Sequence, residues 1–118
     1  MNETEKLVND IVKGIQDKKG HKISVADLNG IGDTICKYLV ICEGNSPTQV
    51  SAIADSVEES ARVNSGIKPI GTEGERNCIW VVMDYADVIV HVFLPEAREF
   101  YDLDNLWEDA KITSYEDI

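Results

Sequence analysis

The sequence predicts a single α/β domain with a mixed, five-stranded sheet flanked by helices, in the order α-β-β-α-β-β-β-α. Three observations lead to this prediction. The length of 118 residues is ordinary for one domain, and a chain of this size can bury about two-thirds of its unfolded surface. Two apolar runs joined by a short polar link, residues 79–83 and 88–94, are typical of an antiparallel hairpin. Helical apolar stripes alternate with short runs rich in valine and isoleucine elsewhere.

The hairpin is the segment against which we expect the others to pack. Both of its runs are nearly continuous in apolar residues, which predicts strands buried on both faces at the centre of a covered sheet. The pleat of the first strand would place Trp80, Val82 and Asp84 on one side. Its alternate residues, such as Val81 and Met83, would then lie on the other side.

The N-terminal third predicts one helix followed by two strands. Residues 3–19 carry apolar side chains at three- and four-residue spacing, with Asn2 or Thr4 available as the N-terminal cap. Short apolar runs at 21–28 and 35–42, separated by turn-forming residues, indicate the strands.

A second helix is predicted to start at a capping box. Ser46 is the cap, Pro47 takes the first helical position and Gln49 lies three residues after the cap. Residues 64–66 (Asn-Ser-Gly) end this helix. The short run 67–70 then reads as a strand, which predicts a right-handed crossover between parallel neighbours.

The C-terminal third is predicted to contain a loop, the hairpin, a third helix and a tail. Residues 71–77 hold two glycines and no apolar side chain, and indicate a loop. The domain would span residues 1–107, and the mostly acidic tail, 108–118, would fray. The helix after Pro95 is expected to dock aromatic residues onto the sheet, namely Phe100, Tyr101 and Trp107.

The cysteines and the N-terminus indicate a cellular compartment. Cys36, Cys42 and Cys78 are odd in number and fit no zinc spacing, so we expect free, buried thiols in a reducing cytosol, with no metal and no cofactor. The first residues lack the core of a signal peptide, and no apolar run is long enough to span a membrane. The sequence therefore predicts a soluble, cytoplasmic protein.

The net charge limits the possible partners. The chain has 22 acidic residues against 11 basic ones, a formal charge of −11, and no basic stripe. Since phosphate neutralisation by lysine and arginine supplies most nucleic-acid affinity, direct nucleic-acid recognition is not expected. A basic protein is the more suitable partner, because opposite charge speeds encounter. The alternative interpretation is that the excess of acidic residues only increases solubility.

A set of residues in a fixed order spans most of the chain: Ala26, Asp27 and Leu28; Cys42, Gly44 and Ser46; Ile53, Ala54 and Asp55; Gly71, Glu73 and Gly74; Trp80, Val81, Val82 and Asp84; the run from Asp87 to Val92; and Arg98, Tyr101, Leu103, Leu106 and Trp107. In these residues the sequence resembles the ribosomal silencing factor family, also called the Iojap family. Ala86 stands where relatives often place glycine, which leaves the type of the hairpin turn open.

The resemblance implies both a fold and a function. The fold would be related to the nucleotidyltransferase superfold but would lack its catalytic residues. The protein would bind the fourteenth protein of the large ribosomal subunit, on the face that meets the small subunit. It would repress translation under nutrient limitation by blocking subunit joining.

Candidate partner-binding residues lie in and around the hairpin. The resemblance places the position of Trp80 in the partner contact, and truncating an interface tryptophan typically costs about 2 kcal/mol or more. His91 shares its strand face with apolar residues and is read as a core histidine. The remaining candidates are polar neighbours of the hairpin: Glu73, Glu75, Asp84, Tyr85 and Asp87.

Two alternatives from other classes remain. Asp84 and Asp87, or Asp102 and Asp104, could hold Mg²⁺ in a nucleotidyl-transferring enzyme. The second pair follows a helix and not a strand, which does not fit that superfold. A self-associating module that forms a homodimer through the Trp80 surface also fits the sequence.

Overall fold

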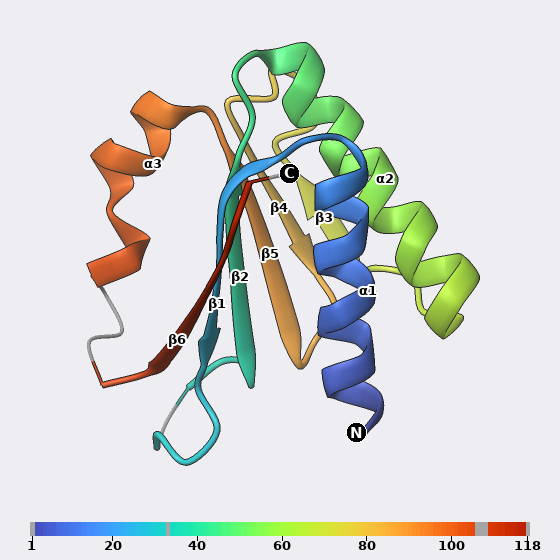
Figure 1. The fold of residues 1–118 in the computed structure, drawn as a ribbon, viewed down its shortest axis with the longest axis vertical. Coiled ribbons are helices and arrows are strands. Elements are labelled where there is room, and N and C mark those ends of the chain that lie inside the picture. Colours follow the sequence, from blue (N-terminus) through green and yellow to red (C-terminus); the bar gives the residue numbers. More distant parts are fainter. Residues whose placement is uncertain (1, 33, 106–108, 118) are drawn as a thin grey trace.

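The protein is described by a computed structural model that covers residues 2–32, 34–105 and 109–117. Helices and strands follow one another in an α/β pattern that ends in a strand (Figure 1). The elements are α1 (Glu3–Asp17), β1 (His21–Asp27), β2 (Tyr38–Glu43), α2 (Pro47–Ser65), β3 (Gly71–Glu73), β4 (Trp80–Asp84), β5 (Val88–Phe93), α3 (Pro95–Tyr101), the 3₁₀ helix η1 (Leu103–Asn105) and β6 (Lys111–Tyr115).

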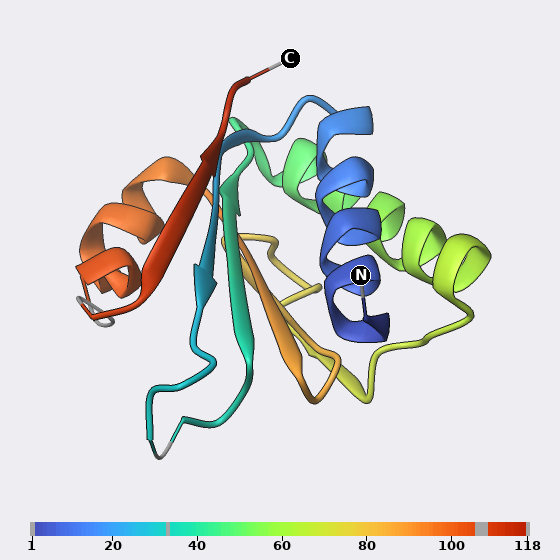
Figure 2. The same ribbon diagram turned by 60° about the horizontal axis from the view of Figure 1, so that its bottom comes forward.

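The strands form one mixed six-stranded sheet in the order β3-β4-β5-β2-β1-β6. β2 and β5 are parallel, and the other neighbours are antiparallel. α1 and α2 pack side by side on one face, and α3 lies on the other, which Figures 1 and 2 show from two directions. Each face therefore has its own apolar core, the larger one beneath α1 and α2.

Both long helices begin and end much as their capping residues predict. Asn2 caps α1 by accepting from the backbone N–H of Glu5 at 2.8 Å. In α2, the Ser46 hydroxyl accepts from the N–H of Gln49 at 3.1 Å, and Gly66 ends the helix in the left-handed region. The two apolar stripes are buried against the sheet and against each other, as expected.

α1 and α2 approach closely at Gly14. A side chain there would begin 2.9 Å from the Ser56 carbonyl oxygen, so only glycine fits this contact without displacement. The space is used for hydrogen bonds between the helices, from the Ser56 hydroxyl to the Gly14 carbonyl at 2.7 Å and from the Ser60 hydroxyl to the Asp10 carbonyl at 2.6 Å. The pair therefore forms one rigid layer.

The hairpin is confirmed, but its first strand is less covered than its composition suggests. Along β5 almost every residue is buried, whereas β4 alternates between buried and half-buried residues. Val81 and Met83 face α1 and α2, and Trp80, Val82 and Asp84 face the other side, as predicted. The prediction of full cover is wrong for β4. α3 is anchored through Arg98 to β1 and β2, and it meets β4 at Trp80 through Tyr101.

The strand that follows α2 lies in a different place from the predicted one. Residues 67–70 form no strand, and Gly71–Glu73, predicted as a loop, pair with β4. β3 is therefore separated from β2 by β4 and β5, and the predicted parallel neighbours do not meet. A three-residue edge strand needs no apolar side chains, which is why its composition resembled a loop.

The C-terminal segment is a strand where a frayed tail was predicted. β6 pairs with β1 over five residues, from Ile23–Tyr115 to Asp27–Lys111, and makes the sheet six-stranded. Most of its side chains are exposed because it forms an edge, so it carries no strong apolar pattern. The prediction for Trp107 lies outside the described residues.

α3 is held to the sheet by a buried ion pair. The guanidinium of Arg98 lies 3.7 Å from a carboxylate oxygen of Glu43, and both side chains are almost fully buried. Arg98 also donates to the Lys22 carbonyl at 2.6 Å. Ala97 packs beneath the helix, but Phe100 is 79% exposed, contrary to the predicted docking of this aromatic residue.

Loss of Arg98 should destabilise the fold strongly. Arg98→Met leaves the Glu43 carboxylate buried without its cation, and we expect about 3 kcal/mol of lost stability in urea unfolding. The double variant Arg98→Met/Glu43→Gln should recover much of this loss. Arg62→Met, on the exposed side of α2, is the control and should change stability by about 0.5 kcal/mol at most. Equal stability of the single and double variants would contradict the ion-pair account.

Candidate functional site

One part of the sheet surface lacks a helical cover. We call it the open face and define it by the residues of β3, β4 and β5 that lie on the α3 side and keep part of their surface exposed: Glu73, Trp80, Val82, Asp84 and Ile89. Glu73 is exposed and the other side chains are half-buried. Strand register places them together, since Val82 is opposite Glu73, and Asp84 is opposite Ile89.

Trp80 is fixed at one end of the open face. Its indole N–H donates to Nδ1 of His91 at 2.9 Å, across the β4–β5 pair. Its ring stacks on Phe93 with centroids 5.0 Å apart and meets the ring of Tyr101 at 4.4 Å. The polar atom of the indole is therefore satisfied within the chain. What Trp80 offers to a partner is apolar ring surface in one orientation.

His91 is the core histidine that the sequence predicts. It is 9% exposed, and burial lowers its pKa from the ordinary 6.5 to about 4. The ring is therefore neutral at neutral pH, with Nδ1 accepting the Trp80 hydrogen bond and the proton on Nε2. His91 orients the indole.

The predicted acidic residues divide into two groups. Asp84 accepts from the N–H of Ala86 at 2.7 Å, and Asp87 lies 3.8 Å from the ammonium of Lys37, so these two carboxylates have contacts at the hairpin turn. Glu73 and Glu75 are exposed, and neither forms an ion pair with another residue that the structure describes. They are the acids available to a basic partner.

Tyr85 does not lie on the open face. It is 5% exposed and packs in the core under α1 and α2. Burial, followed by the charge of Glu58, raises the pKa of its hydroxyl to about 12. Its ring is thus unavailable to a partner in this structure, although the sequence placed it among the contact residues.

Two unusual backbone positions shape the ends of β4. Ala86 adopts φ 70°, so the hairpin turn uses the left-handed region although a glycine is absent. A side chain at Gly74 would begin 1.9 Å from the carbonyl oxygen of Trp80, so glycine is required where the β3–β4 connection passes this tryptophan. The connection from β3 thereby stays close to the start of β4.

Sequence reasoning missed two apolar members of the open face, Val82 and Ile89. Both are half-buried and lie on the same side of the sheet as Trp80. The two-residue spacing from Trp80 to Val82 was a usable signal. No sequence signal marked Ile89, because it lies in a continuous apolar run. Its partial exposure depends on where α3 ends and not on the sequence of β5.

The structure gives two of the candidate metal ligands, Asp84 and Asp102, other local roles, whereas the side chain of Asp104 lies outside the described part of the chain. Asp102 accepts from the side-chain amide of Asn105 at 2.8 and 3.0 Å, and Asp84 serves the hairpin turn. Within residues 2–32, 34–105 and 109–117, no three or more His, Cys, Asp or Glu side chains gather as a metal site. Across the same ranges no helix has the length and apolar character needed to cross a bilayer. The three cysteines are buried and free, as expected.

Burial of His91 should make stability depend on pH. Because the folded-state pKa of His91 lies below the unfolded value, its contribution is full above about pH 6.5 and is lost as pH falls toward 4. Between pH 7 and 5 the wild type should lose about 2 kcal/mol more stability in urea unfolding than His91→Asn, whose amide oxygen can accept the indole hydrogen without titrating. Identical losses in both proteins would contradict this account.

Comparisons with known proteins agree on one family. The model of the family described as "Ribosomal silencing factor during starvation" matches residues 1–118. A "Ribosomal silencing factor RsfS" of Halalkalibacterium halodurans is 35% identical over 114 residues, covering 97% of this chain and 96% of the relative. The Bacillus subtilis protein of the same name is 41% identical over 96 residues, covering 81% and 80%.

A solved structure gives the same result for the fold. The crystal structure of a Chromobacterium violaceum protein superposes with a TM-score of 0.83 at 32% identity, covering 91% of this chain and 87% of that one. Sequence and fold therefore agree over nearly the whole chain, and the protein belongs to the ribosomal silencing factor family.

Proposed function

We propose that the protein is a cytoplasmic translational repressor that binds the large ribosomal subunit through its fourteenth protein. Bound there, it prevents the small subunit from joining when nutrients are limiting. The family description supports silencing of the ribosome during starvation, and the sequence resemblance supplies the partner. The observation that carries the proposal is the open face, an apolar surface bordered by carboxylates without ion pairs.

The composition of the open face suits a protein partner. Protein interfaces combine a dry, aromatic-rich centre with a polar rim, and a few central residues supply most of the affinity. Trp80, Val82 and Ile89 provide the apolar centre, and Glu73 and Glu75 provide the rim. Nothing in this mode of action requires a reaction, since occupancy of the subunit surface is sufficient.

The charge of the protein suits a basic partner. Glu73 and Glu75 add local negative charge to a chain that carries −11 overall. Such a field raises the rate of encounter with a positively charged surface and lowers it for a polyanion such as ribosomal RNA. The protein would therefore meet the ribosome through a basic ribosomal protein.

Trp80→Ala should weaken binding to large subunits by about tenfold or more, because it removes the fixed aromatic surface. We expect the variant to melt cooperatively at a lower temperature, since the contacts with Phe93 and Tyr101 are also lost. The measurement is sedimentation with separated subunits. Val63→Ala, which truncates an exposed residue of α2, is the control and should bind like the wild type. Unchanged sedimentation of a folded Trp80→Ala protein would refute the assignment.

Charge reversal gives a second test that leaves the core intact. Glu73→Lys/Glu75→Lys should weaken binding by about tenfold or more and reduce its dependence on salt. Glu58→Lys/Glu59→Lys makes the same change of charge on the exposed side of α2, over the opposite face of the sheet. If the two double variants lose the same affinity, net charge alone is responsible and the open face is not the contact.

A further inference from the structure

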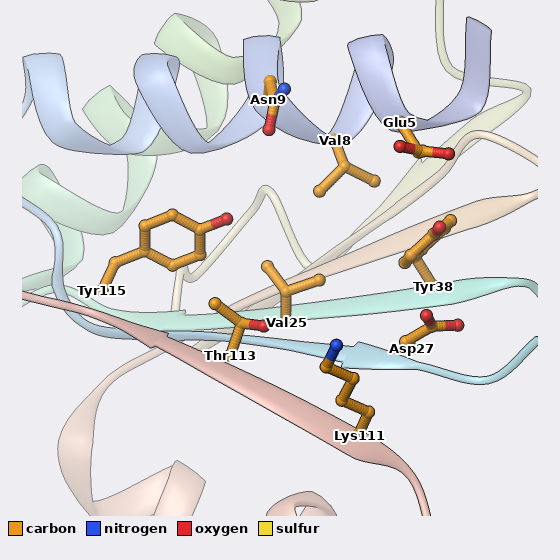
Figure 3. Close-up of a pocket in the computed structure, with 9 residues that line it drawn as sticks. All are labelled: Glu5, Val8, Asn9, Val25, Asp27, Tyr38, Lys111, Thr113 and Tyr115. Carbon is orange, nitrogen blue, oxygen red and sulfur yellow. The ribbon is translucent and has the colours of Figure 1, made fainter. Parts of the chain in front are cut away.

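A pocket lies on the other side of the sheet from the open face, between α1 and the strands β6, β1 and β2 (Figure 3). Its volume is about 190 Å³. It exists because β6 extends the sheet beyond the cover of α1. Alternate residues of β6 face it, and each pairs with a residue of β1 in register: Lys111 with Asp27, Thr113 with Val25, and Tyr115 with Ile23.

The pocket has an apolar side chain on each side and an aromatic side chain at each end. Val8 of α1 and Val25 of β1, both nearly fully buried, face each other across it (Figure 3). Tyr38 and Tyr115 stand at opposite ends, and the hydroxyl of Tyr115 points into the space between them (Figure 3). A ligand with a short apolar stem could therefore pack against valine while its polar groups reach the rim.

The two carboxylates of the pocket, those of Glu5 and Asp27, lie at its Tyr38 end. Burial, and after it the carboxylates of Asp27 and Glu5, raise the pKa of the Tyr38 hydroxyl, so both carboxylates act on the same atom. One oxygen of Asp27 accepts from the backbone and side chain of Asn29 at 2.9 and 2.8 Å. In the part of the chain that the structure describes, neither carboxylate has a cationic partner.

Lys111 brings positive charge to the same pocket. Its side chain rises from β6 beside Asp27 and Thr113 (Figure 3). No ion pair joins Lys111 to another described residue. The pocket thus presents both signs of charge beside apolar side chains. An anion alone would be repelled by the two carboxylates, and a cation alone would leave the ammonium group of Lys111 without a counter-ion.

We propose that this pocket binds a small zwitterion of the free α-amino acid class. Its ammonium group would lie toward Glu5 and Asp27, its carboxylate toward Lys111, and an aliphatic side chain against Val8 and Val25. The volume suits this class, since it is below the range of about 300–1,000 Å³ typical of pockets for drug-sized ligands. The site is separate from the open face, so the proposal stands independently of the ribosomal function.

The test uses three probes with the same branched stem. L-leucine carries both charges, isopentylamine only the ammonium group, and isocaproate only the carboxylate. Amide NMR titration of the full chain should show saturable shifts at Val8, Val25 and Thr113 with L-leucine, with a dissociation constant of about 1 mM. Each single-charge probe should bind at least about tenfold more weakly.

Matched variants locate the site. Glu5→Gln and Lys111→Met should each weaken L-leucine binding about tenfold or more. Glu3→Gln and Lys68→Met make the same changes at exposed positions outside the pocket and should leave binding unchanged. All four lie at exposed positions, so cooperative melting is expected and is checked first.

Three results would overturn the proposal. The first is the absence of saturable shifts with L-leucine. The second is equal binding of isopentylamine and L-leucine, which would show a cation site that makes no use of Lys111. Loss of L-leucine binding in the Glu3 or Lys68 control would place any ligand elsewhere and would count against the pocket as well.

Discussion

The structure depends on an uneven distribution of helices over the two faces of one sheet. α1 and α2 are long helices of 15 and 19 residues, joined closely at Gly14, and they cover one face. α3 has seven residues, and the Arg98–Glu43 ion pair holds it over β1 and β2. The central strand β5 is buried on both faces, whereas β4 keeps one face half-exposed. The open face is therefore a direct result of the length and anchoring of α3.

The same arrangement holds Trp80 in one orientation, which suits the binding role proposed for it. A side chain that must be ordered on association costs entropy, and a side chain that is already ordered avoids much of this cost. His91, Phe93 and Tyr101 hold the indole from three sides before any partner arrives. A buried, neutral histidine suits this task because it can accept the indole hydrogen without adding charge to an apolar cluster. The open face can then act as a rigid platform.

The sequence predicts those parts of the fold that carry a strong local pattern. Both long helices, their caps and the β4–β5 hairpin follow from apolar periodicity and capping chemistry. β3 and β6 were missed because edge strands need no apolar face, so their composition resembles a loop or a tail. The parallel pairing of β2 with β5 joins segments far apart in the chain, and local pattern contains no information about it.

The geometry of the candidate site was predictable only in part. Trp80 was proposed through the family resemblance and the acidic residues through their place beside the hairpin, and the pleat placed Trp80 beside Val82 and Asp84 on the correct side of the strand. Tyr85 was misplaced because a residue in a tight turn has no strand alternation to indicate its direction. The pocket beneath α1 could not be foreseen, since three of its nine lining residues belong to a strand that was predicted only as a tail.

The pairing of β1 with β6 has a consequence for how the chain folds as it is made. The segment of β1 emerges from the ribosome well before that of β6, so the outer edge of β1 stays unpaired until the β6 segment has been made. Unpaired strand edges recruit other strands and promote aggregation. The sheet therefore closes only after the β6 segment has emerged, and until then the edge of β1 is open to association with other chains.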